Sequence, residues 1–120
     1  MKTKQMTFDE YQELARRTQN KDLTYVQRQY HALHGLVSEV GEIHGLFQKI
    51  YQGHPLSLDD LEKEIGDLLW FVAELCDVYD WSMGDVAVEN IEKLKKRYPE
   101  GFDAERSVHR EEYEDGSKEG

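Results

Sequence analysis

The sequence predicts an all-α fold, a bundle of about four main helices. Apolar residues recur at helical spacing, capping signals precede the apolar runs, and no convincing run of alternating β-branched residues is flanked by turn dipeptides. A chain of 120 residues suits one compact domain. We assign residues 1–103 to this domain and expect the charged segment 104–120 to be a disordered tail.

The first helix is predicted to begin near residue 8. Thr7 followed three residues later by Glu10 has the capping-box pattern, in which each residue's side chain bonds the backbone N–H of the other. Behind this cap, apolar residues occupy one helical side: Phe8, Tyr11, Leu14 and Ala15. The pattern fades near Asn20, where we expect the helix to end.

A long second helix is predicted from about residue 25 to residue 51. Gly53 suits the left-handed position after a helix, and Pro55 prevents the helix from continuing. One stripe of this helix is apolar: Leu33, Leu36, Val37, Val40, Ile43, Phe47 and Ile50. We expect this stripe to form core.

The third helix is predicted from Ser57, with Asp60 three residues on, to about Tyr79. One face of it is apolar: Leu61, Ile65, Leu68, Val72, Leu75 and Tyr79. Trp70 points nearly opposite to that face at about 100° per residue. A helix apolar on two sides is usually covered on both, which favours a partner subunit. Cover by the first helix or the tail is the alternative.

The fourth helix is predicted to begin after Ser82, which has Asp85 at the capping-box spacing, and to end at Arg97, because Pro99 follows two residues later. Four such helices with short connections are typical of an up-and-down bundle or of assembled helical hairpins.

Two helical segments repeat one acidic pattern, LVSEVGEIHGLFQKI at 36–50 and LEKEIGDLLWFVAEL at 61–75. Their alignment pairs four carboxylates, Glu39 with Glu64 and Glu42 with Asp67. It also pairs Gly41 with Gly66, and each glycine costs about 1 kcal/mol within a helix. We therefore expect a reason for them, such as close helix approach or room beside a ligand.

The four carboxylates lie on the flanks of the two apolar stripes, so an antiparallel hairpin of these helices would bring them together. Such convergence is unfavourable without a cation. Carboxylate oxygens with no histidine or cysteine in the motif are hard ligands, which favours Mg²⁺ and leaves Mn²⁺ possible. The alternative is a solvated acidic face.

The motifs EVGEI, EIGDLLW and NIEKLKKRYP, in this order, resemble those of the MazG-like nucleotide pyrophosphohydrolases. The resemblance covers about residues 30–99 and implies an all-α fold, a homodimer or homotetramer, and Mg²⁺ held by the acidic side chains Glu39, Glu42, Glu64 and Asp67. It implies hydrolysis of a nucleoside triphosphate or deoxynucleoside triphosphate to the monophosphate and pyrophosphate. Water would attack the α-phosphorus with Glu39 or Glu42 as the base.

Four cationic or polar side chains are candidates for binding the phosphates. Asn90, Lys93 and Arg97 form one stripe of the fourth helix, and the family match raises their weight. Lys49 lies on the same side of its helix as Glu42. The simpler interpretation is that cations near a helix C-terminus stabilise its dipole.

Other conspicuous side chains have simpler interpretations. His31 and His34 share a helical spacing but have no further histidine or cysteine in a ligand pattern, so we expect surface or interface positions. Trp70 and Phe71 are suited to stacking on a base, yet packing is the simpler role. Cys76 flanks an apolar face and is expected to be a buried thiol.

The formal net charge of -10 disfavours nucleic acid as a partner. The sequence has no apolar run of the ~20 residues that span a bilayer, and its polar start is not expected to be a signal peptide. A single cysteine fits a reducing compartment, so we expect a cytoplasmic protein. A di-iron bundle would use ExxH motifs, which are missing. A non-catalytic helical interaction module is the remaining alternative.

Overall fold

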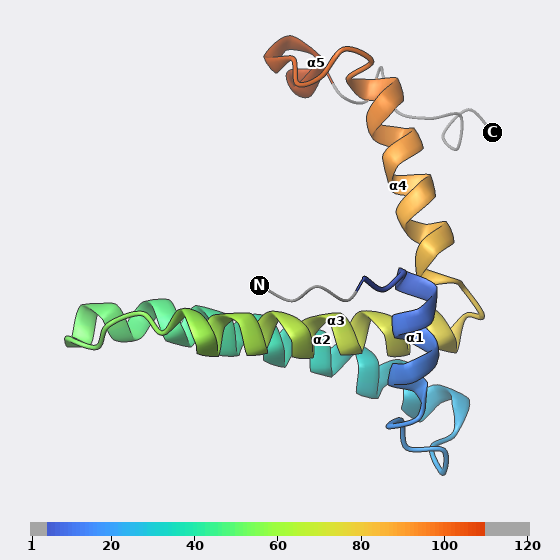
Figure 1. The fold of residues 1–120 in the computed structure, drawn as a ribbon, viewed down its shortest axis with the longest axis vertical. Coiled ribbons are helices and arrows are strands. Elements are labelled where there is room, and N and C mark those ends of the chain that lie inside the picture. The colour runs from blue at the N-terminus through green and yellow to red at the C-terminus, as the bar shows by residue number, and fades with distance from the viewer. Residues whose placement is uncertain (1–4, 110–120) are drawn as a thin grey trace. The chain divides into compact units, whose positions relative to one another are not determined.

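The computed structural model describes residues 5–109 and confirms the all-α fold (Figure 1). The helices are α1 (Phe8–Arg16), α2 (Tyr25–Gln48), the 3-10 helix η1 (Lys49–Gln52), α3 (Leu58–Val78), α4 (Met83–Arg97) and α5 (Ala104–Val108). The chain forms two compact units, one ending at Met83 and the other beginning at Gly84.

Side-chain caps fix the starts of the helices in the first unit. Thr7 and Glu10 form the predicted capping box at α1, and Ser57 accepts a hydrogen bond from the Asp60 N–H at α3, also as predicted. A second capping box, from Thr24 to Gln27, begins α2. At the other end, Gly53 adopts the left-handed conformation with φ of 93° after η1. The expected boundaries therefore agree within a few residues.

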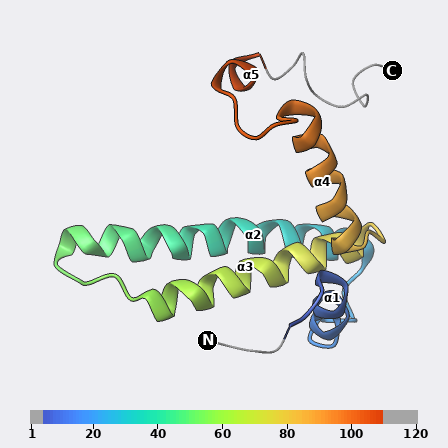
Figure 2. The same ribbon diagram turned by 45° about the horizontal axis from the view of Figure 1, so that its top comes forward.

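The first unit is built on the antiparallel hairpin of α2 and α3, which lie side by side along their length (Figure 2). The helix α1 packs on α3 near its C-terminal end, where Gln12 on α1 bonds Asp77 on α3. The α2–α3 hairpin is the arrangement that was expected to bring the repeated acidic residues together.

The hydrophobic core lies between α1 and α3 and is small. Its buried members are Ala15, Ala73, Cys76 and Met83, with Tyr11, Leu69, Trp70 and Val72 packed against them. Trp70 therefore has cover from its own chain, and its indole N–H donates to the Thr18 hydroxyl at 2.7 Å. Cys76 is the buried thiol that the sequence predicted.

The apolar stripe of α2 departs from the expected core, because much of it stays open in the single chain. Val37 is 69% exposed and Val40 55% exposed, while Ile65 of α3 is 52% exposed. The α2–α3 contact covers only one side of a two-helix hairpin, so the remaining apolar side has no cover within the described part of the chain. Three other members of the predicted stripe are also exposed, Leu33 and Phe47 on α2 and Ile50 in η1.

The second unit contains most of α4, then α5. The helix α4 ends at Arg97 as predicted. The short α5 lies in the segment for which the sequence favoured disorder, and its cap is the Asp103 carboxylate, which accepts hydrogen bonds from the N–H groups of Glu105 and Arg106. The rest of the expected tail, residues 110–120, lies outside the described residues. Within residues 5–109, no helix combines the length and apolar character that crossing a membrane requires.

Candidate metal and active site

Three of the four predicted carboxylates converge. Glu39 on α2 and Glu64 and Asp67 on α3 each place a carboxylate oxygen within 4.8 Å of the other two. Glu64 and Asp67 come from one helical turn, and Glu39 reaches them across the hairpin. We call these three residues the acid cluster. The helical period set which side each acid occupies, and the antiparallel pairing of α2 with α3 joined them.

The acid cluster holds negative charges too close together to be stable alone. The pKa of Glu39 is raised from 4.5 to about 7. The main cause of the raised pKa is the hydrogen bond between the Glu39 and Glu64 carboxyl groups, which forms only when one of these two groups is protonated. Partial burial of Glu39 raises the pKa further, and so do the negative charges of Glu64, Asp67 and Glu42. The cluster therefore binds a proton readily, or another cation.

The donor set fits a hard divalent cation. Glu39 Oε2 is withdrawn from solvent and makes no hydrogen bond to any described residue. A buried carboxylate oxygen without a partner is unfavourable, and a cation would satisfy it. All three side chains offer carboxylate oxygens, the ligands that Mg²⁺ and Mn²⁺ prefer. Asp67 is exposed, so the site is open to substrate and water on that side.

Glu42 is not among the three residues that converge. It is exposed on α2, one turn beyond Glu39, and its charge still contributes to the raised pKa of Glu39. The two repeated glycines also lack the close helix approach considered from the sequence, because a Cβ at Gly41 or Gly66 would meet no atom within 4 Å. The close approach occurs at Gly35, where a Cβ would lie 2.2 Å from the Phe71 ring.

The predicted phosphate-binding side chains lie outside the acid cluster. Lys49 begins η1 and is exposed. Asn90, Lys93 and Arg97 lie on α4 in the second unit. Their role in binding phosphate stays a prediction.

A buried glutamate that the sequence analysis missed lies two turns beyond Asp67 on α3. Glu74 is 1% exposed, and both of its oxygens lie near His31 Nδ1, at 2.7 and 3.0 Å. The signal was a charged residue inside the apolar run WFVAELC. Its partner was not predictable, because 43 residues separate the two in sequence.

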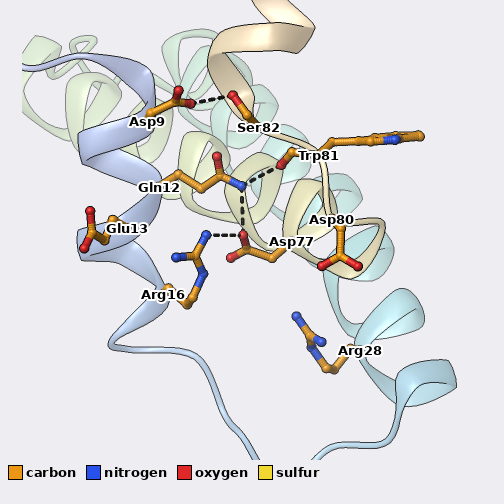
Figure 3. A pocket seen from close by; sticks show the side chains of 9 residues that line it. All are labelled: Asp9, Gln12, Glu13, Arg16, Arg28, Asp77, Asp80, Trp81 and Ser82. Atoms are coloured by element: carbon orange, nitrogen blue, oxygen red, sulfur yellow. Dashed lines mark hydrogen bonds and ion pairs between the residues drawn. The ribbon is translucent and has the colours of Figure 1, made fainter.

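A polar pocket of about 510 Å³ lies where α1 meets the end of α3 (Figure 3). The buried Gln12 donates to the Asp77 carboxylate and the Trp81 carbonyl, and accepts from the Met83 N–H. Arg16 donates to the same carboxylate at 2.8 Å. These bonds hold α1 and the segment before α4 against α3. Gln12, Arg16 and Asp77 are thus engaged in packing, and none of the residues that line the pocket belongs to the acid cluster.

Comparisons with known proteins agree with this geometry. Residues 1–102 match the family described as the MazG nucleotide pyrophosphohydrolase domain. The chain is also 36% identical over 72 residues to the "Gene 37 protein" of Mycobacterium phage L5, a match that covers 56% of this chain and 63% of the phage protein. The comparison with solved structures found no match. The family match spans the hairpin and all three residues of the acid cluster, and the chain belongs to the MazG nucleotide pyrophosphohydrolase domain family.

Proposed function

We propose that the protein is a Mg²⁺-dependent pyrophosphohydrolase that converts a nucleoside or deoxynucleoside triphosphate to its monophosphate and pyrophosphate. The observation that carries the proposal is the convergence of Glu39, Glu64 and Asp67 oxygens within 4.8 Å on the hairpin of a MazG family member. Phosphoryl transfer needs charge neutralisation and alignment, which such a site can supply. Mn²⁺ is the second candidate cation.

In this proposal Glu39, Glu64 and Asp67 hold the cation. When bound, Mg²⁺ supplies positive charge that screens the triphosphate and the departing pyrophosphate. The α-phosphorus gains a bond to the oxygen of a water molecule and loses its bond to the oxygen that bridges to the β-phosphorus. Glu39 and Glu42 are the candidate bases for the water proton. We favour Glu42, because its carboxylate lies near the cluster without belonging to it.

We also propose that the protein works as a homodimer or homotetramer. The exposed apolar side of the hairpin, where Val37 is 69% exposed, supports this assembly. Lys49, Asn90, Lys93 and Arg97 are proposed to bind the phosphates. The positive charges of the two lysines and the arginine, and the amide N–H donors of Asn90, support that role. The single cysteine is the observation that favours a cytoplasmic location.

The proposal is tested by incubating the purified protein with a panel of nucleoside triphosphates and Mg²⁺ and separating the products by chromatography. Monophosphate with pyrophosphate is the expected result, and it should require the added metal. Diphosphate with orthophosphate would contradict attack at the α-phosphorus. If no nucleotide is hydrolysed and calorimetry detects no Mg²⁺ binding, the protein is instead a helical interaction module that retains the fold.

A further inference from the structure

The hydrolytic mechanism gives no role to the buried Glu74 or to its half-exposed partner His31. Glu74 is 1% exposed, and His31 is its hydrogen-bond partner among the described residues. Burying a carboxylate is costly unless it is well paired. A pair that only stabilised the hairpin would be served as well by apolar side chains of similar volume.

The pairing fixes which atom of His31 faces outward. An ionised carboxylate only accepts hydrogen bonds. Nδ1 therefore carries a proton and donates a hydrogen bond to Glu74. In the neutral imidazole, the other nitrogen, Nε2, is the acceptor. It makes no hydrogen bond within residues 5–109, and the His31 side chain is 47% exposed. Glu74 thus orients His31, and the neutral ring has one remaining hydrogen-bond acceptor, Nε2.

Two aromatic rings, Trp70 and Phe71, pack against this imidazole and against each other, and each is held in place. The ring centroid of Phe71 lies 5.7 Å from that of His31, and Phe71 is pressed against Gly35. The ring centroid of Trp70 lies 6.4 Å from His31, and the Thr18 hydroxyl fixes its indole N–H. An oriented polar atom beside fixed aromatic rings is suited to a flat heteroaromatic group.

This group lies along the hairpin from the acid cluster. Phe71 follows Asp67 by one turn of α3, roughly 6 Å, and Glu74 follows Asp67 by two turns, roughly 10 Å. Seven residues amount to about 700°, so Glu74 lies within about 20° of Asp67 around the helix. A nucleotide whose phosphates occupy the acid cluster extends its sugar and base over this scale of distance.

We infer that His31 is a specificity-determining residue whose Nε2 accepts a hydrogen bond from the exocyclic amino group of the substrate base, with Glu74 as its positioning residue. The inference rests on the proposed function and adds a substrate class, bases with an amino group opposite the sugar, such as cytosine and adenine. The matched oxo bases, uracil and hypoxanthine, present a carbonyl acceptor to the same atom. Two facing acceptors repel, which is the physical basis of the discrimination.

The test measures binding, so that it does not depend on turnover. Calorimetry in Mg²⁺ with α,β-methylene analogues of CTP, UTP, ATP and ITP should show roughly tenfold tighter binding of each amino base than of its oxo partner. The variant His31→Asn keeps an N–H for Glu74 and removes Nε2, so it should fold normally and bind the two members of each pair within about twofold. The matched control is His34→Asn on the same helix, which should keep the wild-type ratio. His34 stacks on Tyr30 and has no contact with Glu74.

The positioning role of Glu74 has its own readout. Glu74→Gln retains an oxygen that accepts from Nδ1, so it should preserve the preference for amino bases at close to the wild-type ratio. Equal affinities for amino and oxo analogues in the wild type would overturn the inference, as would an unchanged ratio in His31→Asn. Hydrolysis of UTP and CTP by the wild type is measured separately, so the proposed hydrolase activity stands or falls on its own result.

Discussion

Replacing Glu39 by glutamine should stabilise the metal-free protein. The change removes one charge from the acid cluster and keeps the shape of the side chain. The difference between a pKa of about 7 and the ordinary 4.5 corresponds to ~3.4 kcal/mol, at about 1.36 kcal/mol per pKa unit. The cluster is open to solvent on the Asp67 side, so screening reduces this to about 1 kcal/mol. We therefore expect an increase in Tm of about 4 °C.

The same pKa predicts how stability depends on pH. The folded state binds the Glu39 proton more tightly than the unfolded state does, so the metal-free wild type should lose stability as pH rises from about 4.5 through about 7. Glu39→Gln should lack this loss. Added Mg²⁺ should raise the Tm of the wild type and have much less effect on the variant, because a ligand stabilises only the state that binds it.

The assay is thermal unfolding followed by circular dichroism at low ionic strength, at pH 5 and pH 8, with EDTA or with Mg²⁺. Gln48 on the same helix offers the reverse control, since Gln48→Glu adds a charge on α2 outside the acid cluster and should not reproduce the pH dependence. A metal-free Glu39→Gln protein that unfolds below the wild type would refute the reasoning. Equal stabilisation of both proteins by Mg²⁺ would refute the assigned ligand.

The other predictions concern the cluster, the glycines and the α1 contact. Asp67→Asn should abolish nucleotide hydrolysis while leaving the circular dichroism spectrum unchanged, and full turnover would remove Asp67 from the ligand set. Gly35→Ala should lower the free energy of unfolding by about 1 to 2 kcal/mol in denaturant titration, because overpacking against Phe71 exceeds the gain of about 1 kcal/mol in helix propensity. Gly41→Ala has the same gain without the overpacking, so it should raise the free energy of unfolding. Burial of Asp77 acts to raise its pKa, but hydrogen bonds from Arg16, Gln19 and Gln12 outweigh this and lower it. That stabilising contribution should be present above about pH 4 and lost on further acidification, and Asp77→Asn should remove the acid-dependent part of the unfolding curve.

Local patterns were sufficient to predict most of the helices. Thr7 and Ser57 cap the helices that they were expected to begin, and Gly53 ends the second helical segment as expected. Caps and left-handed glycines depend on atoms within a few residues, so the sequence contains all the partners that matter. The first helix ends at Arg16 instead of near Asn20, whereas the third helix ends at Val78, one residue from the expected Tyr79.

The acid cluster was partly predictable for a similar reason. The helical period puts Glu39, Glu64 and Asp67 on the flanks of their stripes, and the repeated pattern suggested that the flanks face each other. The same reasoning included Glu42, which the structure leaves outside the three residues that converge. Whether a flanking side chain points into a helix pair or past it depends on the crossing of the helices, and a periodic pattern does not specify that crossing.

The sequence by itself determined the helical class, the main caps, the acidic residues and their common side, because each of these follows from bonds and spacings within one or two turns. Only the tertiary structure decided which three carboxylates meet, how much of the α2 stripe remains exposed, and that Glu74 accepts a hydrogen bond from His31. Those outcomes depend on how two helices lie against each other over tens of residues. Contacts between residues so far apart in sequence depend on packing and charge together, and a local sequence pattern does not specify them.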